Sequence, residues 1–471
     1  MTGPEEKDEA ELETPVYLQS EETLSARLEQ IKETGSAADV KKFLKDLYPA
    51  DIARIVLEAG VEEGGSILDR LDAETRGEVL LEMEDPDRVR FMEDLTSREL
   101  ATIVQAQESD EAVDLLSEID EETVSEVLSH MPLEERINVT ELLSYPENSA
   151  GSIMAKEFAS VRETETVKKA ILAFRKASLE AEDIHMVFVL DEDGRYIGHI
   201  DLKKLILANP KSKVKRVMEA DLIPIPVEMD REEVANLFAK YNFISVPVVD
   251  GKGVMLGRIT VDNILDVVQE EASEDILRMS GVGGDETLST PLFQSSSKRI
   301  LWLGVNLLTA FMASAVVRLF EDTISKAVVL AALMPIVAGM GGNAAGQTIA
   351  IIVRNIALGE LTALNAVKAF RRELILGILN GISMGVVTGS VVFLMTGLPA
   401  LGIVICSAMI ANMLVAATAG TAIPVILKML KIDPAIASTI FVTTCTDVLG
   451  FFTFLGLSFL ALPYIVAAGG V

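Results

Sequence analysis

Residues 434–471 read PAIASTIFVTTCTDVLGFFTFLGLSFLALPYIVAAGGV, and this stretch decides the fold class. Asp447 is its one charged side chain. A helix needs about 20 apolar residues to cross the hydrocarbon of a bilayer, so the stretch predicts a membrane span. Asp447 comes about twelve residues into that span, roughly 18 Å along a helix that rises 1.5 Å per residue, and is therefore expected near mid-membrane.

Four more spans are predicted between this stretch and residue 296. Residues 327–353 and 374–427 carry no charge, the second run is interrupted by TGLPA near Pro399, and residues 300–320 are apolar apart from Arg318. A cytoplasmic N-terminus and an outside C-terminus would place eight of the ten basic residues after Ser296 on the cytoplasmic side. The polar, acidic first twenty residues also lack the pattern of a secretory signal. We therefore expect a multi-pass protein of the cell membrane.

Asp447 predicts an ion or proton pathway. A carboxylate at mid-membrane costs several kcal/mol unless something compensates it, and the interior of the predicted spans has no Lys, Arg or His. The remaining partners are a cation, water, or neutral donors such as Thr443, Thr444 and Thr446. The alternative is a protonated acid that is hydrogen-bonded within the helix bundle.

The second span holds PIVAGMGGNAAGQ, residues 335–347. Its glycines, Gly339 among them, either expose backbone carbonyls or let helices approach closely. Asn343 and Gln347 are costly in an apolar span without polar partners. With Asp447 they form an all-oxygen ligand set, which suits magnesium or calcium better than zinc or copper.

The rest of the chain is strongly acidic. Positions 1–295 hold 31 basic and 65 acidic residues. Such a surface repels nucleic acid, so no nucleic-acid partner is expected, and it concentrates divalent cations. The alternative is that the charge only keeps the protein soluble. Cys406 and Cys445 lie in apolar stretches and support neither a disulfide framework nor a cysteine-based zinc site.

The acidic part divides into four predicted regions. Residues 1–21 form a disordered tail. Residues 22–145 form a helical superhelix of short amphipathic segments, one of them opened by the capping-box pair Thr96 and Glu99. Residues 146–261 repeat themselves: VFVLDEDGRYIGHIDLKKL and VPVVDGKGVMLGRITVDNI align 59 positions apart, which resembles a tandem pair of α/β CBS domains. Residues 262–295 connect this pair to the membrane domain, residues 296–471.

Five motifs resemble the MgtE family of magnesium channels: YPENSAGSIM, Pro335, GMGGNAAGQ, IDPA and TTCTDVLGFF. They cover essentially the whole chain in the family order. The resemblance implies a homodimer whose central pore, lined by the second and fifth spans, conducts Mg²⁺ inward. Asp447 would hold hydrated Mg²⁺, with Asn343, Gly339 and Thr443 in the pore. Mn²⁺ or Co²⁺ are further candidate ions, and ATP is a candidate ligand of the CBS pair.

The resemblance also implies a plug helix over about residues 262–280 that closes the pore when cytosolic Mg²⁺ is high. Its acids repel one another unless a divalent ion bridges them, and Asp433 is the expected partner across the gap. The predicted regulatory ligands are Glu232, Asp266, Glu271, Glu274, Asp275 and Asp433, beside which Glu270 adds to the acidic run. Asn242 and Asn263 stand where the family carries Asp and should weaken binding. His130, His185 and His199 show no metal-ligand spacing and are predicted to be structural.

An ion- or proton-coupled secondary transporter is the alternative function. Against it stand the lack of an inverted repeat in five spans and of a second buried ionisable group. An ATPase is disfavoured because the sequence has no Gly-rich loop ending in Gly-Lys-Ser or Gly-Lys-Thr. The helical region shows no catalytic constellation, so we do not expect an enzyme.

Overall fold

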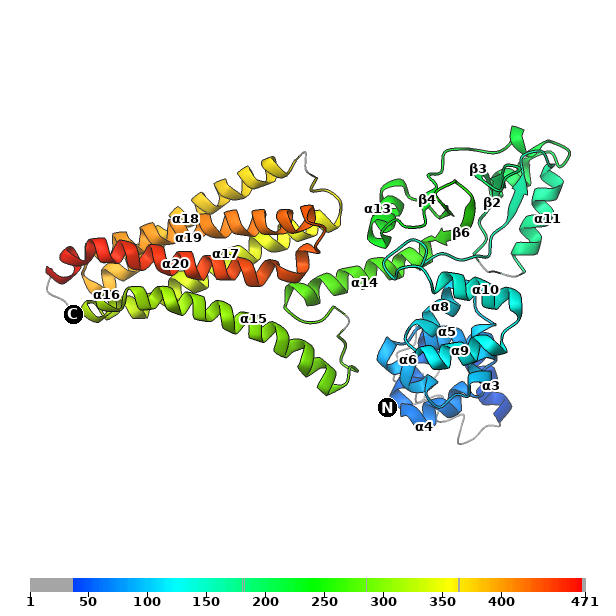
Figure 1. Ribbon diagram of the computed structural model, residues 1–471, viewed down its shortest axis with the longest axis horizontal. Helices are drawn as coiled ribbons and strands as arrows, with labels where there is room; N and C mark the ends of the chain where they lie inside the picture. Colours follow the sequence, from blue (N-terminus) through cyan, green and yellow to red (C-terminus); the bar gives the residue numbers. More distant parts are fainter. Residues whose placement is uncertain (1–36, 180, 182, 285, 363–364, 468–471) are drawn as a thin grey trace, which may run out of the picture. The chain divides into compact units, whose positions relative to one another are not determined.

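The computed structural model describes residues 37–179, 181, 183–284, 286–362 and 365–467. The chain forms two compact units that divide after Val267 (Figure 1). The tail predicted for residues 1–21 lies outside the described residues. The predicted architecture of a helical domain, a repeated α/β pair and five membrane helices is confirmed.

The described part of the first unit begins with a series of mostly short helices, which pack on their neighbours and next-but-one neighbours along the chain. Thr96 and Glu99 form the predicted capping box, with Thr96 accepting from the Glu99 backbone N–H and Glu99 accepting from that of Thr96. The helices are α3 (Ala37–Lys45), α4 (Pro49–Leu68), α5 (Ala73–Leu81), α6 (Asp85–Met92), α7 (Ser97–Val104), α8 (Ser109–Ser117), α9 (Glu121–His130) and α10 (Leu133–Leu142).

Two equivalent repeats follow in the same unit. The first holds β1 (Ser160–Arg162), α11 (Val167–Ala177), β2 (Met186–Leu190), β3 (Tyr196–Asp201) and α12 (Leu202–Leu207); the short helix η2 (Val214–Arg216) comes next. The second holds β4 (Ile225–Pro226), α13 (Arg231–Tyr241), β5 (Ser245–Val249), β6 (Met255–Thr260) and the start of α14 (Val261–Met279). In each three-stranded sheet one outer strand is parallel to the centre and the other antiparallel.

The sheet register reproduces the sequence repeat. Gly198 lies opposite Val189 in the first repeat, and Gly257 lies opposite Val248 in the second. The two repeats differ in what covers them: buried residues of the second repeat share one core with the helical domain, whereas the first repeat has a core of its own.

In its described residues, the second unit contains the rest of α14 and six more helices. These are α15 (Leu292–Leu319), α16 (Glu321–Lys326), α17 (Val329–Ala357), α18 (Ala366–Thr396), α19 (Pro399–Met429) and α20 (Pro434–Ala467). Among the described residues, five helices are long and apolar enough to cross a membrane: α15, α17, α18, α19 and α20. Helix α15 starts before Lys298 and Arg299, which therefore lie in its first turns rather than ahead of it.

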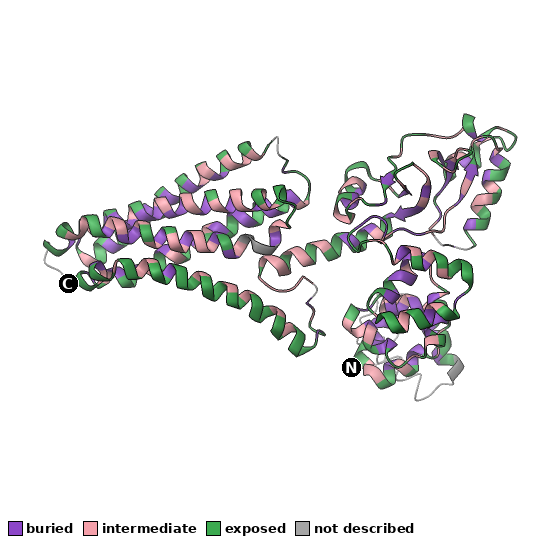
Figure 2. Cartoon of the chain, in the orientation of Figure 1, coloured by how far each residue is buried: buried purple, intermediate pink, exposed green. Residues whose placement is uncertain are grey.

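Close packing holds the membrane helices together. Figure 2 shows buried residues where α17, α18, α19 and α20 face one another, and exposed residues along almost all of α15. Four glycines spaced four residues apart on α18 form a glycine ridge against α19: Gly377, Gly381, Gly385 and Gly389. A methyl group at any of them would come within 2.6–2.9 Å of an α19 atom, so only glycine permits this approach.

Candidate functional site

Asp447 is half-buried in the middle of α20. Within the described ranges of the chain, no hydrogen bond or ion pair reaches its carboxylate. The threonines predicted as neutral donors are used elsewhere: Thr444 donates to the Ile440 carbonyl at 2.6 Å, and Thr446 to that of Thr443 at 2.9 Å. Thr443 itself donates to the Thr439 carbonyl. Since each hydroxyl has one proton, these groups cannot compensate the Asp447 charge.

The glycines of α17 fall on two faces. Gly339 and Asn343 are exposed on one face, where Gln347 follows one turn later. Gly341 is buried against Asn412 of α19 on the opposite side, and Gly342 is half-buried between the two faces, 3.5 Å from the Thr443 methyl group, measured from an ideal Cβ. Gly341 therefore serves helix packing, whereas Gly339 lies on an open face of α17.

Asn412 is a polar residue that the sequence interpretation missed. It is 1% exposed, and its Nδ2 donates to the Val337 carbonyl of α17 at 2.9 Å. Its amide also abuts Gly341 of α17 and Gly450 of α20, so it lies where three membrane helices meet. The available signal was an amide in the charge-free run 374–427, which also contains Asn380.

Glu373 corrects one expectation. The sequence suggested no second buried ionisable group in the membrane domain, but Glu373 of α18 is 4% exposed. Arg372 lies 2.8 Å from it, and Thr348 of α17 donates to it at 3.4 Å. The adjacent arginines Arg371 and Arg372 made this segment look like a loop, whereas the helix already includes it.

The acids of α14 lie near Asp433, but an arginine joins them. Arg278 forms ion pairs with both Glu274 and Asp433. Burial, then the nearby carboxylates of Asp433 and Glu271, raise the pKa of Asp275 to about 6. Sequence reasoning considered a divalent ion as the bridge and overlooked Arg278, one turn beyond Glu274, which supplies part of the compensating charge.

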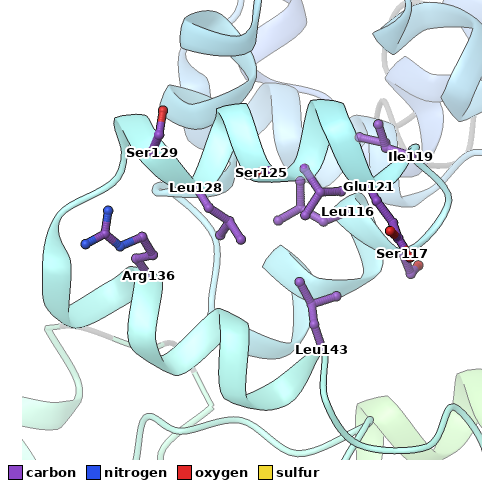
Figure 3. A pocket seen from close by; sticks show the side chains of 10 residues that line it. Leu116, Ser117, Ile119, Glu121, Ser125, Leu128, Ser129, Arg136 and Leu143 are labelled. Atoms are coloured by element: carbon purple, nitrogen blue, oxygen red, sulfur yellow. The ribbon is translucent and has the colours of Figure 1, made fainter.

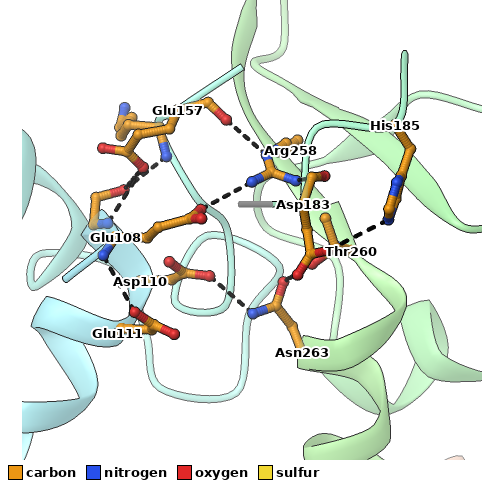
Figure 4. A network of polar contacts seen from close by, with 11 residues as sticks. Glu108, Asp110, Glu111, Glu157, Asp183, His185, Arg258, Thr260 and Asn263 are labelled. Carbon is orange, nitrogen blue, oxygen red and sulfur yellow. Dashed lines mark hydrogen bonds and ion pairs between the residues drawn. The ribbon is translucent and has the colours of Figure 1, made fainter. Parts of the chain in front are cut away.

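A polar network joins the helical domain to the second repeat (Figure 4). Arg258 of β6 is 2% exposed; its Nη2 lies 2.8 Å from a Glu108 oxygen, and its Nε donates to the Glu157 carbonyl at 2.6 Å. Asn263 donates to Asp110 at 2.8 Å and accepts from the Thr260 backbone at 3.1 Å. Arg258 thus pairs with Glu108, and the neutral amide of Asn263 pairs with Asp110. The sequence interpretation expected Asn263 only to weaken ion binding.

Two carboxyl groups in this network have raised pKa values. Burial, then the charge of Glu157, raises the pKa of Asp110 to about 6. Burial, then the charge of Asp110, raises the pKa of Glu111 to about 8. The ionised forms are therefore unfavourable here, and a bound divalent cation would relieve them. The acidic run at 108–111 was the sequence signal for this cluster, which our interpretation did not use.

The other regulatory candidates lie in the second repeat. Glu232 is in the first turn of α13, where its backbone N–H donates to Asp230 at 2.9 Å. Partial burial, then Glu82 and Asp262, raise the pKa of Asp266. Asn242 has a φ of 53° and ends α13 in the left-handed conformation. Asparagine tolerates this conformation well, so backbone geometry accounts for the residue at this position.

The helical domain has a pocket of about 640 Å³. Figure 3 shows its side chains, which come from α8, α9 and α10 and the segments beside them. The lining is mostly aliphatic and serine, with Glu121 and Arg136 as its charged members. We assign no chemistry to this pocket.

The three histidines have different surroundings. His130 Nδ1 lies 2.9 Å from the Glu126 carbonyl, and His185 lies 3.7 Å from Asp183. His199 is buried and lies beside Asp201 and Glu219, a grouping that sequence reasoning missed. In a strand, residues two apart share a face, so the His-x-Asp spacing of β3 was the available signal.

Comparison with known proteins matches the helical domain, the two repeats and the membrane domain from α17 to most of α20. A divalent cation transporter model matches residues 334–457, the MgtE intracellular N domain matches 47–148, and the CBS domain matches 150–210 and 214–270. The magnesium transporter MgtE of Bacillus subtilis is 33% identical over 317 residues, covering 67% of this chain and 70% of that protein.

Two further matches agree. The magnesium transporter MgtE of Thermus thermophilus is 32% identical over 327 residues, covering 69% of this chain and 72% of that protein. The solved soluble part of a magnesium transporter is 26% identical with a TM-score of 0.50; the match covers 54% of this chain and all of that one.

Proposed function

Because the chain belongs to the MgtE family of magnesium transporters, we propose that it is a magnesium-selective channel conducting Mg²⁺ inward across the cell membrane. The observation that carries the proposal is Asp447, a carboxylate in the middle of α20 to which the described residues give no compensating partner. A hydrated divalent cation supplies that compensation. The membrane potential then favours inward movement by roughly 4.6 kcal/mol per 100 mV for a divalent ion, so no pump is needed.

The polar face of α17 supports a pore at the interface of a homodimer. Gly339, Asn343 and Gln347 are exposed in one chain. Two amides facing lipid would lack hydrogen-bond partners, which is costly in hydrocarbon. A second copy of the chain across a water-filled path would give them polar surroundings. Asn343, Gly339, Thr443 and Asp447 are the proposed pore residues.

We also propose that cytosolic Mg²⁺ closes this pore. Glu271, Glu274, Asp275 and Asp433 would bind it at α14, with Glu232 and Asp266 as ligands in the second repeat. The raised pKa of Asp275, about 6, supports a site where a cation relieves carboxylate repulsion. The N-terminus would be cytoplasmic and the C-terminus outside. ATP remains a proposed ligand of the CBS pair, and Mn²⁺ and Co²⁺ are proposed minor ions.

Single-channel recording from purified protein in planar bilayers tests the proposal. We expect unitary Mg²⁺ currents that reverse at the Mg²⁺ equilibrium potential and whose open probability falls as cytosolic Mg²⁺ rises into the millimolar range. Mg²⁺ flux without unitary currents would contradict a channel. An open probability independent of cytosolic Mg²⁺ would contradict the regulatory part alone.

Glu373 favours one second candidate, a proton- or ion-coupled transporter. It is a buried carboxylate in contact with α17, and such groups can relay protons. Its place in the second turn of α18, beside Arg372, makes it less suited to this role than a mid-membrane acid. Dependence of Mg²⁺ flux on an imposed pH gradient at fixed voltage would support the coupled transporter.

A further inference from the structure

A second polar cluster lies in the first repeat, on β3 and the segment between η2 and β4. His199 and Asp201 are two residues apart on β3. Glu219 is held beside them because its backbone exchanges two hydrogen bonds with His199, at 2.8 and 2.9 Å. One nitrogen of His199 and one oxygen each of Asp201 and Glu219 all lie within 4.8 Å of one another.

The His199 ring is in an unusual environment. Its side chain is 5% exposed, and Nε2 lies 3.4 Å from Asp201 and 3.8 Å from Asp221. Nδ1 has no hydrogen-bond partner. Buried polar atoms normally have one, so a buried ring that faces two carboxylates and leaves one nitrogen unsatisfied calls for a functional explanation.

We propose that His199, Asp201 and Glu219 bind a divalent transition-metal ion of the zinc class. One imidazole nitrogen and two carboxylate oxygens provide three protein ligands and leave a fourth position open. Mg²⁺ favours oxygen ligands, and imidazole suits zinc and its neighbours. The site therefore differs in chemistry from the all-carboxylate clusters of α14. Asp221 adds negative charge beside it, and Lys204 pairs with one oxygen of Glu219.

In the second repeat an arginine occupies the position that matches His199. Arg258 stands 59 residues after His199, and its guanidinium supplies a permanent positive charge among Glu108 and the Glu157 carbonyl. In the first repeat His199 stands at this position, and the proposed ion would supply the positive charge there. A bound metal would tie β3 to the segment that leads into the second repeat.

Calorimetric Zn²⁺ titration of the full-length chain in detergent, with millimolar Mg²⁺ present throughout, tests the proposal. We expect one Zn²⁺ per chain that Mg²⁺ does not displace. His199→Gln should weaken this binding at least about tenfold, since even outer-shell changes at metal sites cost 10–100-fold. His185→Gln is the matched control, because His185 also lies near an aspartate, at 3.7 Å, and should leave binding unchanged.

Two results would overturn the proposal. The first is a parent chain that binds no Zn²⁺ in the presence of Mg²⁺. The second is His199→Gln binding Zn²⁺ as tightly as the parent, which would leave His199 as an imidazolium held by Asp201 and Asp221. If His199→Gln does not fold, Asp201→Asn keeps the ring and the side-chain volume. Its Zn²⁺ affinity should also fall about tenfold, and an unchanged affinity would equally reject the site.

Discussion

The contact around Arg258 in the first unit and the middle of α20 in the second unit treat carboxylates differently. In the first unit, Glu108 meets the guanidinium of Arg258, and Asp110 meets the amide of Asn263. In the second unit, the described residues offer Asp447 no such partner. A carboxylate that the protein compensates itself stabilises a domain contact, whereas one left uncompensated in an apolar span is available to an ion.

The strongest test of this contrast is Asp447→Asn. At an effective dielectric near 20, a single charge about 5 Å from a divalent ion contributes roughly 6 kcal/mol, so Mg²⁺ flux should fall by more than about a hundredfold. Flux into proteoliposomes loaded with a magnesium-sensitive dye measures it. The variant should still purify with the parent's oligomeric state. Normal flux would remove Asp447 from the pore.

Arg258→Met should have the largest effect in the first unit. It leaves the Glu108 side chain, which is 19% exposed, without the Arg258 guanidinium, and breaking such a pair costs up to about 3–5 kcal/mol, the value for fully buried partners. Hydrogen exchange of α8 and the urea midpoint of the full-length chain should both report the loss. Lys169→Ala, which removes the exposed partner of Glu165, is the control and should shift stability by less than about 0.5 kcal/mol. Equal effects of the two variants would mean that the Arg258–Glu108 pair contributes no more to stability than an exposed ion pair.

The cluster at α14 lies between these extremes, because Arg278 compensates only part of its charge. Replacing Glu271, Glu274 and Asp275 by Ala removes both the repulsion and the ligands, so channel activity should vary little with cytosolic Mg²⁺. Arg278→Gln leaves the acids uncompensated and should make Mg²⁺ close the pore at lower concentration. Bilayer recording compares both with the parent. Closure of the triple variant at the parent's Mg²⁺ concentration would place control elsewhere.

Asn263→Asp should convert a self-compensated contact into an ion-dependent one. The new carboxylate faces Asp110, so without divalent ions the contact should lose about 1–3 kcal/mol, the cost of an unsatisfied buried group. Millimolar Mg²⁺ should restore most of that loss by bridging the two acids. Thermal unfolding with and without Mg²⁺ measures the difference. A melting temperature insensitive to Mg²⁺ would show that this position cannot take up an ion.

The smallest expected effect is a pH dependence of the same contact. The pKa values of Asp110 and Glu111, about 6 and about 8, lie above the ordinary values of 3.8 and 4.5. The folded state therefore binds more protons, so this stability is full below the ordinary pKa values and is lost as pH rises from 3.8 to about 6 for Asp110 and from 4.5 to about 8 for Glu111. The melting temperature should fall over that window, and Mg²⁺ should flatten the fall. A rise in melting temperature with pH would contradict the assignment.

Much of the architecture follows from local patterns. The five spans are predicted from apolar runs, and the two repeats from segments that align at an offset of 59 residues. The start of α7 is predicted from Thr96 and Glu99. The site is harder to predict because its pairings are distant in sequence: Arg258 and Glu108 are 150 residues apart, and Arg278 and Asp433 are 155. Nothing in local periodicity encodes which acid a given arginine meets.

The glycine ridge of α18 has a mechanical consequence. Because backbone contacts backbone at Gly377, Gly381, Gly385 and Gly389, the pair α18–α19 has no side-chain layer that could shear. The two helices should therefore move as one rigid body in the bilayer. A conformational change that opens the membrane unit then has to move helices other than α18 and α19. An alanine in the glycine ridge would push α18 and α19 apart before it affected ion passage.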